Sequence, residues 1–495
     1  MERISKDIQL TRKDIAISVT ILAAFFAACF TAFFFGFGFL GKAPDFGGAE
    51  ISATALYTVS AAIFLLIPCF VFLSFWAFMR KGLKQHRLLL LACLLLFLTY
   101  AGCILAWNIT QYALPICVAA IVAAHLLDTR LGFVFNVVSV LLVIHFAAAA
   151  DLAGKTTEGF ASIILPATVN LLFGCILAFQ VGQNVPRLQF IGRILLNAAA
   201  VLPLIILFIL LADPAGENIL LKTGIGFLMQ IAFPLILIPI FEFMFNLPTN
   251  NRFIVLSDYK QPLLARLASE TPATFNHSQI VGNFAESCAG AIGENVYLAR
   301  AAAMYHDIGK LANAEYYTEN QTGINPHDNL PPELSAAIIR KHAEDGYEMV
   351  RANGVPEEIA AICLEHHGTM PITSFVSKAQ RITDVDSELD MDLYRYRGPV
   401  PSSKIAAIVM ICDCSEAAIR SIKTNDRKLI DDMVQKNIHE RINAGQFDNC
   451  GITLQELAII RQILVDFSTG VYHKRIEYPK QPPPRTEQLT ILNDK

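Results

Sequence analysis

Residues 305–310 read Tyr-His-Asp-Ile-Gly-Lys, and this stretch decides how the second half of the chain is interpreted. It follows a run in which alanines recur at the three- and four-residue spacing of a helix face. An imidazole and a carboxylate buried at the end of such a face without partners would be costly, so His306 and Asp307 need compensation. A cation bound by both side chains would supply that compensation.

Further histidines and an aspartate lie on or at the ends of other predicted helices. His366 and His367 form a second adjacent pair that closes a helix, and His277, His342 and Asp413 lie on three more. Imidazole and carboxylate together are the ligand set of catalytic Fe, Mn and Zn sites. A single histidine on a helix is more often structural, and it is the two adjacent pairs that favour a metal site.

The sequence pattern around these residues predicts that the second half of the chain is an all-α domain. Apolar side chains recur at helical spacing over residues 257–269, 277–292, 296–311, 332–352, 356–366, 402–423 and 454–472, and few segments alternate as strands do. The segment 257–269 is expected to be an amphipathic juxtamembrane helix at the start of a domain over 251–478. Residues 479–495 contain three consecutive prolines and are expected to form a flexible tail.

The first half has the composition of a membrane domain. Of the 495 residues, 54% are hydrophobic and 17% charged, but residues 1–250 hold only 14 basic and 11 acidic side chains. A membrane-crossing helix needs about 20 mainly apolar residues. Eight windows approach this length, near residues 15–40, 55–79, 88–107, 111–127, 131–150, 161–181, 194–211 and 223–245. The sequence therefore predicts about eight transmembrane helices, the first near 15–40 and seven between 55 and 246.

The distribution of charge predicts the orientation of these helices. Basic residues cluster in the N-terminal tail and after the second, fourth and sixth windows, whereas the alternate connections are short and acidic. By the positive-inside rule, both termini of this multi-pass chain are expected to be cytoplasmic. Residues 251–495 carry 25 basic and 32 acidic side chains, a net charge of −7, which argues against a DNA or RNA duplex as partner.

The stretch 305–310 resembles the signature of the HD-domain metal-dependent phosphohydrolases. The wider pattern adds His277-Ser278, Glu319-Asn320-Gln321, Asn325-Pro326-His327-Asp328, His366-His367-Gly368-Thr369, Arg395-Tyr396 and Glu416-Ala417-Ala418. Together with the membrane half, this looks like the seven-transmembrane HD family of PgpH type, in the bacterial cytoplasmic membrane. The resemblance implies hydrolysis of cyclic di-AMP to the linear dinucleotide pApA, with the lipid bilayer as partner. The sequence leaves open whether a second copy of the chain joins it in a homodimer.

The same resemblance implies which side chains act on the phosphodiester. Two divalent metal ions are implied, Fe or Mn rather than Zn, with Asp307 bridging them. The remaining ligands would be His277, His306 and Asp413 for one metal, and His342, His366 and His367 for the other. Hydroxide activated by both metals would attack phosphorus in line with the departing 3′ oxygen.

Other side chains are candidates for contact with the substrate. Lys310 lies one turn beyond the ligand pair and is expected to take a catalytic role at a substrate phosphate; the alternative is a solvated cation at a helix end. Arg420 lies two turns after Asp413, and either contacts phosphate or pairs with a glutamate one turn before it. Asn325, Thr369 and Tyr396 are further candidates for contact with the nucleotide.

The sequence leaves other functions open. They are a phosphodiesterase for another cyclic dinucleotide or nucleotide, a membrane receptor that binds nucleotide without turnover, and a transporter. Cyclic di-GMP phosphodiesterases of HD type carry Gly-Tyr-Pro after the paired histidines, where this chain has Gly368-Thr369-Met370. A pure binding module would not need seven ligands, and the membrane half shows scattered prolines rather than broken helices. The family also has an extracellular sensor domain after its first helix, for which residues 41–54 leave no room.

Overall fold

The computed structural model describes residues 11–39, 53–79, 86–107, 114–152, 161–182, 187–212, 219–321, 323–382, 389–422 and 426–471. The chain divides into two compact units, the first of Met1–Asp258 with Gly354–Pro356, and the second of Tyr259–Asn353 with Glu357–Lys495. Within the described ranges every regular element is a helix, and an isolated bridge between Pro371 and Arg395 is the single strand-like pairing. The prediction of an all-α chain is therefore confirmed. The expected tail over 479–495 and most of the connection over 41–54 lie outside the described residues.

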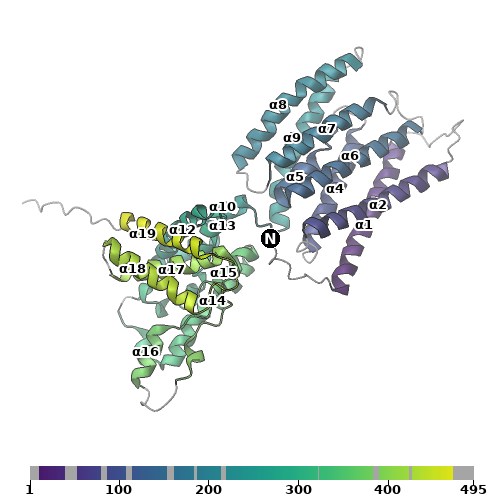
Figure 1. The fold of residues 1–495 in the computed structure, drawn as a ribbon. Coiled ribbons are helices and arrows are strands. Elements are labelled where there is room, and N and C mark those ends of the chain that lie inside the picture. Colours follow the sequence, from purple (N-terminus) through teal and green to yellow (C-terminus); the bar gives the residue numbers. More distant parts are fainter. Residues whose placement is uncertain are drawn as a thin grey trace, which may run out of the picture. The chain divides into compact units, whose positions relative to one another are not determined.

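The first unit is a bundle of apolar helices (Figure 1). Its elements are α1 (Arg12–Phe39), α2 (Ala53–Phe78), α4 (His86–Ala106), α5 (Val118–Leu126), α6 (Thr129–Leu152), α7 (Ala161–Gln180), α8 (Arg187–Ala212), α9 (Ile219–Met244) and the short α10 (Asn250–Leu256). In the described part of the chain, five helical segments are long and apolar enough to cross a membrane: Arg12–Phe35, Thr58–Phe78, His86–Ala106, Thr129–Ala150 and Gly224–Met244. The number of crossings, about eight, remains a prediction.

The window expected as a span over 111–127 holds a much shorter helix. α5 has nine residues, which reach about 14 Å, half of a hydrocarbon core of about 30 Å. All nine are buried, and the non-helical residues before them are held by the side chain of Gln230. Its Nε2 donates to the carbonyl of Leu114 at 2.7 Å and to Oδ1 of Asn170 at 2.8 Å. Non-helical backbone in an apolar bundle needs such internal partners, because lipid offers none.

The second unit is also built of helices (Figure 1), and its described residues form a larger hydrophobic core and a smaller one. Its elements are α11 (Pro262–Glu270), α12 (Pro272–Ala291), α13 (Val296–Tyr305), η1 (Ile308–Ala312), η2 (Ala314–Tyr316), η3 (Thr318–Asn320), η4 (Pro326–Asn329), α14 (Pro332–Ala352), α15 (Glu357–Glu365), α16 (Thr373–Ile382), η5 (Met391–Tyr394), α17 (Lys404–Ile422), α18 (Arg427–Asn443) and α19 (Leu454–Val471). α12 contacts α13, α17 and α19, and buried alanines of α13 let α12 approach closely. The larger core holds α12, α13, α15 and α17, and the smaller one holds α14 against α16 and η5. Together they fix the helices that carry the polar cluster described below.

Several elements differ from the sequence expectation, which includes no counterpart of α16. The helix expected over 257–269 begins only at Pro262, because proline suits a first helical position and cannot continue a helix from the residues before it. The helix expected over 296–311 ends at Tyr305 and continues as the 3₁₀ turn η1. α18 was not predicted, since its apolar side is the narrow stripe of Ile430, Val434 and Ile438 in a strongly polar helix.

Candidate metal centre

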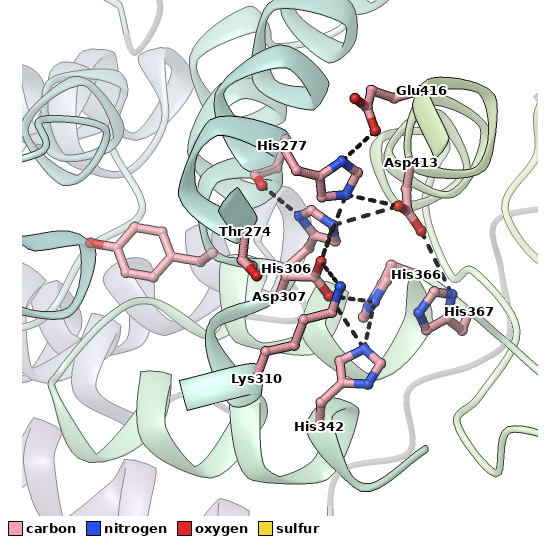
Figure 2. A network of polar contacts seen from close by, with 12 residues as sticks. Thr274, His277, His306, Asp307, Lys310, His342, His366, His367, Asp413 and Glu416 are labelled. Atoms are coloured by element: carbon pink, nitrogen blue, oxygen red, sulfur yellow. Dashed lines mark hydrogen bonds and ion pairs between the residues drawn. The ribbon is translucent and has the colours of Figure 1, made fainter. Parts of the chain in front are cut away.

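Five histidines and two aspartates from separate elements converge in the second unit (Figure 2). Their nitrogen and oxygen atoms form two groups, Asp307 with His342, His366 and His367, and His277 with His306 and Asp413; within each group these atoms lie within 4.8 Å of one another. Six of the seven residues are buried, and His367 is half-buried. The structure therefore brings together every side chain that was named as a metal ligand.

A close approach of two backbones places Asp307 among the histidines. Its η1 turn is pressed against α14 at Gly309, where a Cβ atom would lie 2.0 Å from the carbonyl oxygen of His342 and 2.5 Å from the nitrogen of Gly346. Only glycine fits at such a contact. As a result, Oδ1 of Asp307 lies 3.4 Å from Nε2 of His342.

The turn that carries the second histidine pair also depends on a glycine. Gly368 has φ +52°, and a Cβ there would lie 2.0 Å from Oε1 of Gln446. This amide fastens the turn, because Thr369 N–H donates to Gln446 Oε1 at 3.0 Å and Gln446 Nε2 donates to Thr369 Oγ1 at 2.8 Å. The result is a rigid connection between the end of α15 and residues after α18.

Hydrogen bonds at the outer ring nitrogens fix how the histidines face the centre. Nδ1 donates to a backbone carbonyl in His306 (to Ala303, 2.6 Å), His342 (to Ile339, 2.6 Å) and His366 (to Cys363, 2.8 Å). A carbonyl only accepts, so Nδ1 of each ring must carry the proton. The unprotonated Nε2 atoms, with their lone pairs, therefore point at the centre, as in metal-bound histidines.

The two oxygens of Asp307 face different groups. Oδ1 lies 3.4 Å from Nε2 of His342 and 3.8 Å from Nε2 of His366. Oδ2 lies 3.3 Å from Nε2 of His306 and 3.7 Å from Nε2 of His277. This carboxylate therefore stands between the two groups with one oxygen toward each.

Several buried polar atoms of the cluster lack hydrogen-bond partners among the described protein atoms. Nε2 of His306 and Oδ1 of Asp307 are buried and have no hydrogen-bond partner among the described residues. Nε2 of His342 lies 3.2 Å from Nε2 of His366, although both rings carry their proton at Nδ1, so two lone pairs face each other. Buried acceptors in this state are costly, and a cation would satisfy them together. The donor set of imidazole and carboxylate fits Fe, Mn or Zn.

Burial and charge move the pKa values of these histidines in opposite directions. In the absence of a cation, burial lowers the pKa of His306, but the carboxylates of Asp307 and Asp413 outweigh it and raise that pKa to about 10. A metal ion bound at Nε2 would replace the proton that this pKa places there. Burial lowers the pKa of His366, and repulsion from the positive charge of protonated His306 and His342 lowers it further, to about 3. The electrostatic field thus favours positive charge beside the two aspartates.

Lys310 lies half-buried beside the cluster, with 14% of its side chain exposed, rather than solvated at a helix end. Its Nζ lies 2.7 Å from Oδ2 of Asp307 and 2.8 Å from Oε1 of Glu319 (Figure 2 draws it pointing at Asp307). Burial alone would lower the pKa of Lys310, but the two carboxylates raise it above its usual range. The ammonium also lies 5.2 Å from the centre of the Tyr317 ring. Lys310 is therefore a charged group held against the carboxylate of Asp307.

The four remaining candidates fall into two pairs. Tyr396 and Thr369 lie at the centre's edge: the Tyr396 ring stacks on His367, with centroids 4.1 Å apart, and Thr369 belongs to the turn that carries His367. Asn325 instead caps η4, where its Oδ1 accepts from the N–H of His327 at 3.0 Å. Arg420 is exposed, with its Nη2 3.6 Å from Oε2 of Glu416, which is the pairing that the sequence left open.

Two acidic residues at the site belong to the quoted family pattern, but the sequence analysis assigned them no role at the metal centre. Oε2 of Glu416 accepts a hydrogen bond from Nδ1 of His277 at 2.6 Å, and Glu319 holds Lys310. Glu416 lies three residues after Asp413 on α17, hence on the same helix face. That spacing was a signal for Glu416, whereas the fold alone brings Glu319 to Lys310.

Comparison with known proteins finds relatives of the region that contains this site. Residues 274–418 match the HD domain family. The cyclic-di-AMP phosphodiesterase PgpH of Listeria monocytogenes is 43% identical over 243 residues, which cover 49% of this chain and 33% of the relative. PgpH of Bacillus subtilis is 40% identical over 245 residues, covering 49% of this chain and 34% of the relative. The crystal structure of the L. monocytogenes PgpH HD domain in complex with cyclic-di-AMP shares 42% identity, with a TM-score of 0.42, and covers 44% of this chain and 100% of that one.

The matches bear on the half of the chain that holds the cluster. The aligned region spans about a third of the length of each curated relative. The chain contains an HD domain, and the resemblance to PgpH-type proteins that the motifs predicted is confirmed for this half.

Proposed function

We propose that this HD-domain chain is a membrane-bound, metal-dependent phosphodiesterase that hydrolyses cyclic di-AMP to pApA. The observation that carries the proposal is the pair of ligand groups on either side of Asp307. The choice of cyclic di-AMP as substrate is supported by two relatives. Both bear the name cyclic-di-AMP phosphodiesterase, and they are 43% and 40% identical over the half of the chain that contains these groups.

The ligand geometry favours two cations over one. We assign one cation to His277, His306 and Asp413 and the other to His342, His366 and His367, with one oxygen of Asp307 toward each. Two divalent ions about 3.5–4 Å apart lower the pKa of water and neutralise charge on a phosphoryl group. Imidazole binds several transition metals, and Fe or Mn is the native choice that we propose from the family resemblance.

Lys310 is proposed to act on the phosphate through its fixed charge. The ion pair at 2.7 Å orients Oδ2 of Asp307, and the ammonium is a point charge close to where the phosphoryl oxygens would lie. Tyr396 and Thr369, at the edge beside His367, are proposed substrate contacts. For Asn325 and Arg420, the capping bond and the ion pair with Glu416 favour structural roles.

We further propose that the first half anchors this enzyme in the bacterial cytoplasmic membrane with both termini in the cytoplasm. Five apolar helices of sufficient length support a membrane location. Cytoplasmic termini follow from the distribution of basic residues in the connections. A homodimer is the proposed assembly.

The test uses the full chain purified in detergent and loaded with Mn²⁺. Cyclic di-AMP and cyclic di-GMP are supplied in parallel and the products are separated by chromatography. We expect pApA from cyclic di-AMP, and no product from the variants His306→Ala and Asp307→Ala. Absence of pApA, with cyclic di-AMP bound but intact, would identify a receptor; faster cleavage of cyclic di-GMP would reassign the substrate.

A further inference from the structure

Glu416 is a buried carboxylate whose closest partner is a candidate metal ligand. Its side chain has no exposed area, and its Oε2 accepts the Nδ1 proton of His277 at 2.6 Å (Figure 2). The other ring nitrogen, Nε2, lies 3.1 Å from Oδ1 of Asp413. His277 is therefore held from both sides by carboxylates of one helix, α17.

This arrangement distinguishes His277 from three other histidines of the cluster. His306, His342 and His366 donate their Nδ1 protons to neutral backbone carbonyls. A carboxylate behind an imidazole fixes the same tautomer but also makes the ring a stronger electron donor. Nδ1 of His367 lies 3.7 Å from Oδ2 of Asp413, which is too far for a hydrogen bond. Among the described residues, the group of His277 thus contains a hydrogen-bonded carboxylate support that the histidines of the other group do not have.

The other contacts of Glu416 do not account for its burial. Its Oε1 has no hydrogen-bond partner within the described ranges, and the nearest cation, Arg420, is 44% exposed and lies 3.6 Å away. A surface guanidinium at that distance contributes little. A buried carboxylate is costly unless it is paired, so its compensation must come chiefly through His277.

We propose that Glu416 is a positioning residue that raises the affinity of the cation held by His277, His306 and Asp413. The inference rests on the proposed dimetal function and deepens it, because it makes the two cation sites unequal. Loss of the charge at position 416 should weaken one site and leave the site of His342, His366 and His367 in place. Removal of such a support usually costs about 10–100-fold in metal affinity.

The experiment measures metal binding rather than turnover. The full chain in detergent is stripped with a chelator, dialysed against increasing free Mn²⁺, and its bound metal is counted by mass spectrometry. We expect two Mn²⁺ per parent chain. In Glu416→Ala one of the two binding steps should move to about 10–100-fold higher Mn²⁺, and in Glu416→Gln, which keeps an acceptor for Nδ1, the same step should move less.

Two controls separate this role from a structural one. Asp431→Asn breaks another carboxylate pair of the unit, with Arg461, and should leave both steps unchanged. Arg420→Ala should also leave them in place; a loss as large as that of Glu416→Ala would mean that Glu416 acts through its pair with Arg420, against the proposal.

The outcomes distinguish this inference from the proposed function. Unchanged binding in Glu416→Ala, or equal weakening of both steps with a lower melting temperature of the metal-free chain, would overturn the positioning role alone. A parent chain that binds fewer than two Mn²⁺ and releases no pApA would overturn both proposals.

Discussion

The substitution Gly309→Ala tests whether the contact between η1 and α14 builds the metal centre. The added Cβ would lie 2.0 Å from the carbonyl oxygen of His342 and 2.5 Å from the nitrogen of Gly346. Ordinary contacts begin above 3 Å, so the two backbones must separate by at least about 1 Å. Because both close atoms belong to the backbone of α14, no side chain can swing aside to relieve the clash.

The size of the effect follows from this geometry. Overpacking costs about 1–3 kcal/mol, and a backbone clash belongs at the upper end of that range. For a domain of this size, about 3 kcal/mol corresponds to a fall of about 6–12 °C in melting temperature. A shift of about 1 Å between Asp307 and His342 should also lower turnover about 100-fold and weaken the binding of Mn²⁺.

The assay measures the melting temperature, the binding of Mn²⁺ and the release of pApA. The melting transition of the second unit is identified as the one whose temperature rises when Mn²⁺ is added. Gly323→Ala is the matched control, since a Cβ there meets nothing within 4 Å. It should behave as the parent. If Gly309→Ala keeps the parent's melting temperature, Mn²⁺ affinity and turnover, then the close approach does not position Asp307 and the reasoning is wrong.

Three further predictions follow from the same contacts. In Lys310→Met, loss of the ammonium 2.7 Å from Asp307 should lower turnover of cyclic di-AMP about 100–1,000-fold while two Mn²⁺ still bind; a parent-like rate would remove Lys310 from the chemistry. A chelator should abolish hydrolysis and lower the melting temperature of the second unit, because cations that bind only the folded state stabilise it, and Mn²⁺ should restore both. The hydrogen bond from Arg461 lowers the pKa of Asp431, so this half-exposed pair should stabilise the fold by up to about 1 kcal/mol above the unfolded pKa of about 3.9 and lose that contribution as pH falls through the folded value. The melting temperature of Asp431→Asn should accordingly be lower than the parent's at pH 7 and equal to it near pH 2; an equal difference at both pH values would exclude the ion pair as its cause.

The cluster was predictable from sequence where its members are adjacent in the chain. His306 with Asp307, and His366 with His367, are polar pairs at the ends of apolar helices, and their burial demands compensation whatever the fold. The helical character of the second unit followed from apolar spacing in the same way. These are local signals, and the described structure agrees with them.

Contacts between distant segments were beyond the sequence. Glu416 lies 139 residues from the histidine to which it is hydrogen-bonded. Glu319 and Tyr317 lie nearer in the chain to Lys310, but they reach it through irregular turns for which no apolar pattern gives a signal. The same holds for the end of α13, which the apolar pattern extended to residue 311. There the close contact at Gly309 requires a tighter turn than a helix permits.

Charge at the centre explains how a unit with an acidic balance would carry out the proposed action on a phosphate. Among the groups at the centre, Asp307, Asp413, Glu416 and Glu319 are carboxylates and Lys310 is the one ammonium. With the imidazoles neutral, these groups carry a net charge of about −3. One divalent cation would leave the centre negative and repel a phosphodiester, whereas two would make it positive by about one charge before a bound water loses its proton. A phosphodiester group carries one negative charge, so only the doubly loaded centre attracts it and is neutral once it binds.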